Sequence, residues 1–277
     1  MNYFQLIKWG RARINERHLD ANVAAYLLRR RLKWNVTHLL MNYRTRVAPT
    51  IFQQFKRDLN RYLAGEPPQY IIGTAPFYGY NFLVNRHVLI PRPETEGLVD
   101  WILHDCHQHS LRLVDVGTGS GAIAIALKLN RPRWQITASD ISQPALDVAE
   151  KNALDHHAKV KFKRCDLFAG LSKRHYDVIV ANPPYVAYDE IKEMDSDVFH
   201  WEPHLALFAP DHGLKMYQRI ARNFADYLRP DGDLYLEIGF HQRSAVTRIF
   251  SRQKLVDSVW VRPDLAGHPR MVKVKLK

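Results

Sequence analysis

The 277 residues are enough for one large domain, or for a large domain with a small companion. A content of 46% apolar and 25% charged residues is ordinary for a globular protein, which excludes a disordered chain, a collagen-like chain and a small disulfide scaffold.

The formal net charge of +12 is unevenly distributed along the chain. Residues 1–80 carry 13 basic and 4 acidic residues, a net charge of +9. Residues 81–242 carry 18 and 22, a net charge of −4, and residues 243–277 carry 9 and 2, a net charge of +7. Positive charge at both ends suggests an acidic or polyanionic partner for these flanks, or a basic surface that only keeps the protein soluble. Charge alone leaves both open.

The chain has two cysteines, Cys106 and Cys165, which favours a reducing compartment over a disulfide framework. Three basic residues interrupt the first 14 positions, which lack the apolar core of a signal peptide. No stretch approaches the roughly 18 uncharged apolar residues that cross a bilayer. We therefore expect a cytoplasmic protein without membrane contacts.

The first 66 residues have the periodicity of helices. Asp20 is a plausible N-cap for a helix through Leu32, and a second helix follows Pro49 and ends at Gly65. Three prolines and three glycines in residues 65–79 predict a linker. Alternating apolar residues over 80–84 and then 88–90 predict a hairpin that turns near residues 85 and 86. We expect an all-α domain over 1–66 and a linker with a β-hairpin over 67–90.

Beyond this point, strands alternate with helices. Strands are predicted over 111–116, 134–139, 160–162, 176–181 and 233–238, and helices over 122–129, 144–153 and 214–228. Residues 271–276 alternate as an edge strand would. This order predicts an α/β domain over 91–277, with a Rossmann-like, mostly parallel sheet and helices on both faces.

A glycine-rich loop, Asp115-Val-Gly117-Thr118-Gly119-Ser120-Gly121, joins the first of these strands to its helix. Glycines let a ligand approach the backbone, and the helix N-terminus offers unpaired N–H groups. Asp140 ends the next strand, where an acid can accept hydrogen bonds from both hydroxyls of a ribose. The spacing lacks the gap that seats a pyrophosphate and the ending of an ATPase loop, so a nucleoside without phosphates fits better. The alternative is a structural turn with an exposed acid.

The end of the third strand offers a possible adenine site. Asp166 is placed to receive an adenine amino group, and Leu167 and Phe168 are candidates to pack on the purine ring. An ordinary loop carboxylate explains Asp166 equally well.

Asn182-Pro183-Pro184-Tyr185 follows an apolar strand, at the strand end where open α/β sheets place their sites. The two prolines fix φ and remove two donors. The Asn182 side-chain oxygen and the Pro183 carbonyl can accept both hydrogens of one planar NH₂ group. Tyr185 offers an aromatic face to a flat amide or base. This motif predicts alignment of an amide or amino nitrogen toward an electrophile, without a strong base.

These residues resemble the class I methyltransferases and, more narrowly, the release-factor glutamine methyltransferase family, also called PrmC or HemK. The resemblance extends over nearly the whole chain, including a basic helical domain before the catalytic one. Besides the two motifs above, it rests on Leu89-Ile-Pro-Arg-Pro-Glu-Thr-Glu96, Glu202-Pro203, Leu205-Ala-Leu207, Gly213-Leu214, Leu236-Glu-Ile-Gly239 and Asp264-Leu-Ala-Gly267.

The resemblance implies methylation of the side-chain amide nitrogen of the glutamine in the Gly-Gly-Gln motif of peptide-chain release factors. It implies S-adenosylmethionine as the cofactor, held by Gly117, Thr118, Gly119, Ser120, Gly121, Asp140, Asp166, Leu167, Phe168 and Asn182. The glutamine would contact Asn182, Pro183, Pro184 and Tyr185, with Asn182, Pro183 and Tyr185 as the catalytic residues. Whether Leu167 or Phe168 packs on the purine stays open.

Further expectations draw on the resemblance, the charge distribution and the scattered histidines, which lack metal-ligand spacing. The partner is a release factor, recognised by residues 1–66, whose positive charge, including that of Arg29, Arg30 and Arg31, would help to dock an acidic protein. We expect a monomer without a metal and without direct nucleic-acid binding.

Three alternatives remain. A sister enzyme that methylates a ribosomal-protein glutamine shares the Asn-Pro-Pro-Tyr motif, and an adenine amino methyltransferase of nucleic acids solves the same geometric problem. A non-catalytic binding module would need a damaged motif, and both motifs are intact. The roles of Arg92, Glu94, Thr95 and Glu237 stay open: Thr95, for example, could line the pocket or cap a helix.

Overall fold

The structure, a computed structural model, describes all 277 residues. The chain divides into two compact units. Unit 1 contains residues 1–74 together with 195–201, and unit 2 contains residues 75–194 and 202–277.

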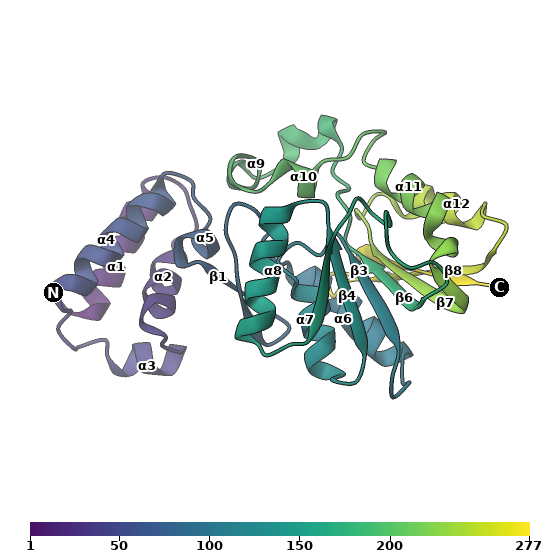
Figure 1. Ribbon diagram of the computed structural model, residues 1–277. Coiled ribbons are helices and arrows are strands. Elements are labelled where there is room, and N and C mark those ends of the chain that lie inside the picture. The colour runs from purple at the N-terminus through teal and green to yellow at the C-terminus, as the bar shows by residue number, and fades with distance from the viewer. The chain divides into compact units, whose positions relative to one another are not determined.

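Unit 1 is helical (Figure 1). Its helices are α1 (Tyr3–Asn15), α2 (Val23–Leu32), α3 (Val36–Met41), α4 (Pro49–Leu63), α5 (Pro68–Ile72) and the short α9 (Ser196–Trp201). The apolar faces of α1 to α5 share one core, which includes Leu6, Leu27 and Phe55. The cap of α2 differs from expectation, because Asn22 stands at the N-cap and the Asp20 side chain accepts the Asn22 N–H at 2.9 Å.

Arg31 cross-links three helices of unit 1. Its guanidinium donates to both carboxylate oxygens of Asp58 on α4, at 2.7 and 3.0 Å, and to the Ile71 carbonyl oxygen on α5 at 2.7 Å. The Asp58 carboxylate is buried, so this contact compensates a charge inside the unit. Arg31 therefore has a structural partner, unlike the freely docking cation that we expected at this position.

Unit 2 contains a seven-stranded sheet with the order β5-β4-β3-β6-β7-β9-β8. The strands are β3 (Arg112–Val116), β4 (Gln135–Asp140), β5 (Val160–Arg164), β6 (Tyr176–Ala181), β7 (Leu228–Glu237), β8 (Val256–Pro263) and β9 (Pro269–Leu276). The first five in this order are parallel, and β9 is antiparallel to both of its neighbours. The connections reverse direction at β3, which has β4 on one side and β6 on the other, and such a switch point opens a crevice at the carboxyl ends of the strands.

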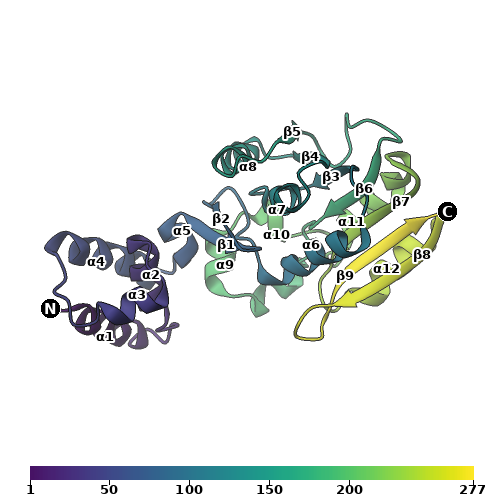
Figure 2. The same ribbon diagram turned by 90° about the horizontal axis from the view of Figure 1, so that it is seen from below.

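Helices cover both faces of the sheet (Figure 2). One face carries α6 (Pro93–Asp105), α7 (Ala122–Asn130) and α8 (Gln143–Asp155). The other carries α11 (Lys215–Asn223), the 3₁₀ turn η2 (Phe224–Asp226) and α12 (Arg243–Ser251). The turn η1 (Tyr188–Glu193) and the short α10 (His204–Leu207) complete the chain. The Rossmann-like class and its helical companion are confirmed.

Three details differ from the sequence predictions. The hairpin pairs β1 (Thr74–Phe77) with β2 (Tyr80–Leu83) and turns at Tyr78 and Gly79, both at positive φ, so the expected turn near residue 85 is wrong. The predicted linker is ordered, since it forms α5 and β1. Strand β9 is not an edge strand, because β8, which we did not predict, pairs with its outer side.

Of all the helices, none has both the length and the apolar composition required to cross a lipid bilayer.

Candidate active site

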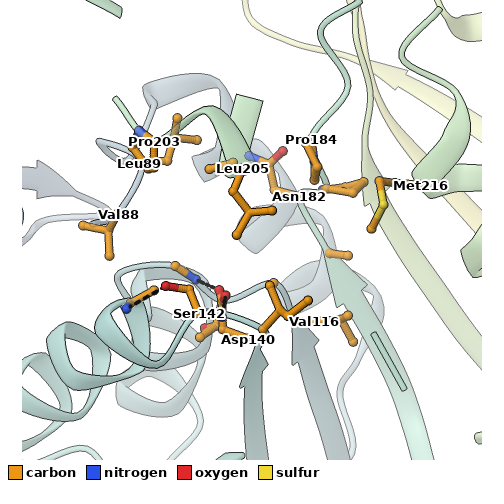
Figure 3. A pocket seen from close by; sticks show the side chains of 18 of the residues that line it. Val88, Leu89, Val116, Asp140, Ser142, Asn182, Pro184, Pro203, Leu205 and Met216 are labelled. Atoms are coloured by element: carbon orange, nitrogen blue, oxygen red, sulfur yellow. Dashed lines mark hydrogen bonds between the residues drawn. The ribbon is translucent and has the colours of Figure 1, made fainter. Parts of the chain in front are cut away.

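A cavity of about 620 Å³ opens at the carboxyl ends of β3, β4 and β6, within the size range of small-molecule sites. The glycine loop and residues 140–142 form one side, residues 87–92 and 203–210 face them, and Asn182 and Pro184 lie beside Leu205 on the facing side (Figure 3). Figure 3 shows Asp140 and Ser142 opposite Val88 and Leu205. Met216, Arg219 and Ile220 of α11 add a further wall. Two predicted motifs thus share one cavity.

Most of the predicted site residues line this cavity. Lining residues from the prediction are Gly117, Thr118, Gly119, Ser120, Asp140, Asp166, Leu167, Asn182, Pro183 and Pro184. Three do not line it, namely Gly121, Phe168 and Tyr185.

The glycine loop presents bare backbone to the cavity. Gly117 and Gly119 have φ of +74° and +56°, a conformation that side chains disfavour, and no heavy atom lies within 4 Å of an ideal Cβ at either position. The Ser139 carbonyl oxygen accepts the N–H groups of Gly117 and Thr118 at 2.8 and 2.9 Å, which holds the loop against β4. A ligand can therefore lie directly on the loop, beside the first turn of α7.

The Asp140 carboxylate is oriented by two backbone donors. Its Oδ2 accepts the Gly119 N–H at 2.9 Å and its Oδ1 accepts the Ser142 N–H at 2.9 Å. Burial raises the pKa of Asp140. Because a carboxylate has about four acceptor positions, each oxygen retains capacity for one more donor. Two neighbouring hydroxyls, as on a ribose, match that capacity.

In the turn after β5, Leu167 and Phe168, the two candidates for packing on the purine, have different surroundings. Leu167, at φ +51°, lines the cavity. Phe168 is buried in the core and stacks on Tyr227, with ring centroids 4.8 Å apart. Asp166 lines the cavity, and its Oδ2 accepts from Arg219 at 2.7 Å. Leu167, and not Phe168, is therefore the apolar side chain of this turn that lines the cavity.

Gly121 and Tyr185 support the site from outside the cavity. A Cβ on Gly121 would lie 2.9 Å from Ile125 and 3.2 Å from Ala149, so a side chain would crowd the contact of α7 with α8. The Tyr185 carbonyl oxygen accepts from Gln242 at 2.9 Å, and a Cβ on Gly213 would collide with that oxygen. This packing fixes the backbone that follows the two prolines.

The sequence left the roles of Arg92, Glu94, Thr95 and Glu237 open, and the structure gives them different contacts. Thr95 lies in the first turn of α6, where Arg92 is the N-cap residue, so Thr95 is not the cap. Its hydroxyl donates to Glu237 Oε2 at 2.6 Å and accepts from Asn182 Nδ2 at 3.3 Å. Tyr185 donates to Glu237 Oε1 at 3.4 Å. Burial raises the pKa of Glu237 to about 7, while its hydrogen bond from Thr95 and the nearby Arg270 act in the opposite direction. Glu94 is among the acids near Glu237.

A buried ion pair joins the two segments of the facing wall. Glu202 accepts the Ile90 N–H at 3.0 Å and pairs with the Arg92 guanidinium. Ile90 and Arg92 belong to the segment 87–92, and Glu202 directly precedes the segment 203–210. The sequence signals were the two short stretches noted above, although neither stretch indicated that its residues pair.

Sequence reasoning missed the wall from α11. Met216, Arg219 and Ile220 recur at helical spacing, which predicts a shared face but does not say that this face meets a cavity. No group of three or more His, Cys, Asp or Glu side chains is arranged to hold a metal ion.

Comparison with known families gives two matches. Residues 5–73 match the PrmC N-terminal domain, and residues 95–200 match the methyltransferase small domain.

Individual relatives extend this likeness over the chain. The release factor glutamine methyltransferase of Streptococcus pneumoniae is 47% identical over 223 residues, 80% of each chain. That of Enterococcus faecalis is 36% identical over 269 residues, 97% of each chain. Among solved structures, a methyltransferase from Pyrococcus furiosus has a TM-score of 0.56 at 15% identity and covers 80% of this chain and 98% of its own, a likeness of fold.

Proposed function

Because the chain belongs to the release factor glutamine methyltransferase family, we propose that it methylates the side-chain amide nitrogen of the glutamine in the Gly-Gly-Gln motif of peptide-chain release factors. The chain is an S-adenosylmethionine-dependent protein glutamine N-methyltransferase. One observation supports the choice of this site: the glycine loop and the Asn-Pro-Pro segment line the same cavity.

The residues present fit S-adenosylmethionine. Gly117 and Gly119 expose backbone to the cavity, and Asp140 retains acceptor capacity on both oxygens for ribose hydroxyls. We propose that Leu167 packs on the adenine and that Asp166 lies beside its amino group, since both line the cavity. Phe168 is left out of the proposal because it is packed in the core. When bound, the cofactor supplies an electrophilic methyl group on a sulfonium.

Asn182 and Pro183 are proposed to align the substrate amide. The Asn182 side-chain oxygen and the Pro183 carbonyl accept its two hydrogens, which fixes the plane of the NH₂ group. Neither Pro183 nor Pro184 has a backbone N–H, so these two positions offer no competing backbone donor. The nitrogen is thereby presented to an electrophile on its open side.

An amide nitrogen is a weak nucleophile, so the protein must act through alignment and water exclusion. Val88, Leu89, Pro203 and Leu205 form an apolar wall across the cavity from Asp140 (Figure 3). Transfer would exchange the methyl–sulfur bond for a nitrogen–carbon bond and leave a neutral thioether, and the amide nitrogen would release one proton to solvent. Tyr185 is proposed to hold the turn in place, which replaces the stacking role that its aromatic ring suggested.

We propose that residues 1–66 recognise the release factor, with residues 67–90 as the connection and residues 91–277 as the catalytic domain. The match of residues 5–73 to the PrmC N-terminal domain supports a separate role for the helical part. Its net positive charge suits an acidic protein surface.

Labelled S-adenosylmethionine and a purified release factor test the proposed function. We expect label in the release factor, and mass spectrometry should place one methyl group on the motif glutamine. A matched release factor with that glutamine replaced by alanine should stay unlabelled. Equal labelling of the two would overturn the proposal.

A further inference from the structure

We propose that Thr95 and Glu237 are positioning residues that hold the Asn182 side chain with its oxygen, and not its nitrogen, toward the substrate amide. This inference rests on the proposed function and names the part of the protein that makes the site select an NH₂ donor.

Three side chains from distant parts of the sequence form a continuous hydrogen-bonded chain. Asn182 Nδ2 donates to Thr95 Oγ1 at 3.3 Å, and Thr95 Oγ1 donates to Glu237 Oε2 at 2.6 Å. Thr95 is 5% exposed and Glu237 is 1% exposed, so water does not compete freely for either group. Asn182 and Thr95 both line the cavity, whereas Glu237 lies behind them.

The direction of this chain follows from donor chemistry. An ionised carboxylate only accepts hydrogen bonds, so the Thr95 hydroxyl must use its single hydrogen on Glu237. The hydroxyl oxygen can then only accept from Asn182. The Asn182 side chain must therefore present Nδ2 to Thr95, which leaves Oδ1 as the group available to a ligand.

That orientation decides which substrate group the site accepts. Asn182 Oδ1 and the Pro183 carbonyl form a pair of acceptors, which suits an NH₂ group with two hydrogens. A flipped Asn182 would place its own NH₂ against that of the substrate. A carboxylate in place of the amide would face two acceptors. The hydrogen bonds that link Asn182, Thr95 and Glu237 thus favour glutamine over glutamate as the reacting side chain of the substrate.

The surroundings of Glu237 hold its carboxylate between several groups. Thr95 and Glu94 come from α6, Tyr185 from the turn after β6, and Arg270 from β9. The Tyr217 hydroxyl of α11 donates to the Glu237 carbonyl oxygen at 3.0 Å and anchors the end of β7. Burial raises the pKa of Glu237, whereas the hydrogen bond from Thr95 and the nearby Arg270 lower it and favour the ionised form, in which Glu237 accepts from Thr95.

Thr95→Val tests the inference because valine keeps the shape of threonine and lacks the hydroxyl. We expect kcat to fall about 10- to 100-fold, since Asn182 loses the contact that fixes its orientation. The affinity for S-adenosylmethionine, measured by calorimetry, should stay unchanged. Thr95→Ser keeps the hydroxyl and should restore most of kcat.

A double-mutant cycle separates positioning from a general structural effect. In an Asn182→Ala background, Thr95→Val should cause no further loss in single-turnover rate, because no side-chain amide remains to be oriented. An equal further loss in that background would overturn the inference, as would full activity of Thr95→Val. A wild-type chain that leaves release factors unmethylated would instead contradict the proposed function.

A pH profile gives a second readout. Protonated Glu237 can donate to Thr95, which frees the Thr95 hydrogen and removes the fixed direction. We therefore expect wild-type kcat to fall as pH drops through the Glu237 pKa of about 7. Glu237→Gln, which cannot titrate, should lack this step. The same step in the variant would refute the role of Glu237.

Discussion

The ion pair between Arg92 and Glu202 should stabilise unit 2 and shape its cavity. The Glu202 side chain is 1% exposed and that of Arg92 is 32% exposed. Glu202→Ala removes the partner of a partly buried guanidinium and leaves the Ile90 N–H without its acceptor. Both losses affect the segments that face the glycine loop.

The magnitude follows from burial. Removing one partner of a fully buried pair costs about 3–5 kcal/mol. Because solvent reaches part of Arg92, we expect a loss of about 2–3 kcal/mol in the free energy of unfolding. For a domain of this size, each kcal/mol lowers Tm by about 2–4 °C, which gives a decrease of about 4–12 °C.

Thermal unfolding and calorimetry with S-adenosylmethionine check the prediction. Glu202→Gln keeps an oxygen for the Ile90 N–H and should lose less stability than Glu202→Ala. Asp226→Ala is the control, because its pair with Lys173 is 59% and 68% exposed and should contribute little. If Glu202→Ala and Asp226→Ala melt together, and both bind the cofactor like the wild type, the reasoning is wrong.

Two further predictions concern binding and docking. Asp140→Ala should weaken S-adenosylmethionine binding about 10- to 100-fold by calorimetry, because the ribose hydroxyls lose a charged acceptor. The control Asp147→Ala, on the exposed side of α8, should leave the affinity unchanged. Unchanged affinity of the Asp140 variant would exclude Asp140 from the site. Charge reversal at the exposed Arg11 and Arg44 should raise KM for the release factor at low salt and leave Tm unchanged, whereas Arg31→Glu should lower Tm because it places a negative charge beside the buried Asp58. If the Arg11 and Arg44 variants have the same KM for the release factor as the wild type at low salt, the basic surface serves only to keep the protein soluble.

Sequence patterns predicted the features that depend on neighbouring residues. The strands 112–116 and 176–181 are apolar runs between turn residues, and each precedes a short motif whose residue types limit the backbone. Gly117 and Gly119 adopt positive φ, as a glycine-rich turn at a ligand site requires. Local chemistry is therefore enough to locate the carboxyl edge of the sheet and most residues that line the cavity.

Features that depend on distant partners were not predictable in this way. Strand β8 alternates weakly, because its burial comes from pairing with β9 and packing under α12. Phe168 and Leu167 are adjacent apolar residues, and only the core around Tyr227 determines which one is buried. Tyr185 follows two prolines in a site motif, yet its ring lies outside the cavity, because its hydroxyl donates to Glu237 and its backbone carbonyl oxygen accepts from Gln242.

The segment 92–96 illustrates why a short stretch can be more specific than its chemistry suggests. Arg92 pairs with Glu202, Thr95 donates to Glu237, and the Glu96 carboxylate accepts the Tyr78 N–H at 2.7 Å. Three side chains within five residues thus contact three different places: Arg92 contacts Glu202 at the facing wall of the cavity, Thr95 contacts Glu237, and Glu96 contacts the turn of the hairpin. Each contact tolerates few replacements because its partner is fixed elsewhere in the fold, so the residue types in this segment are set jointly by three separate parts of unit 2.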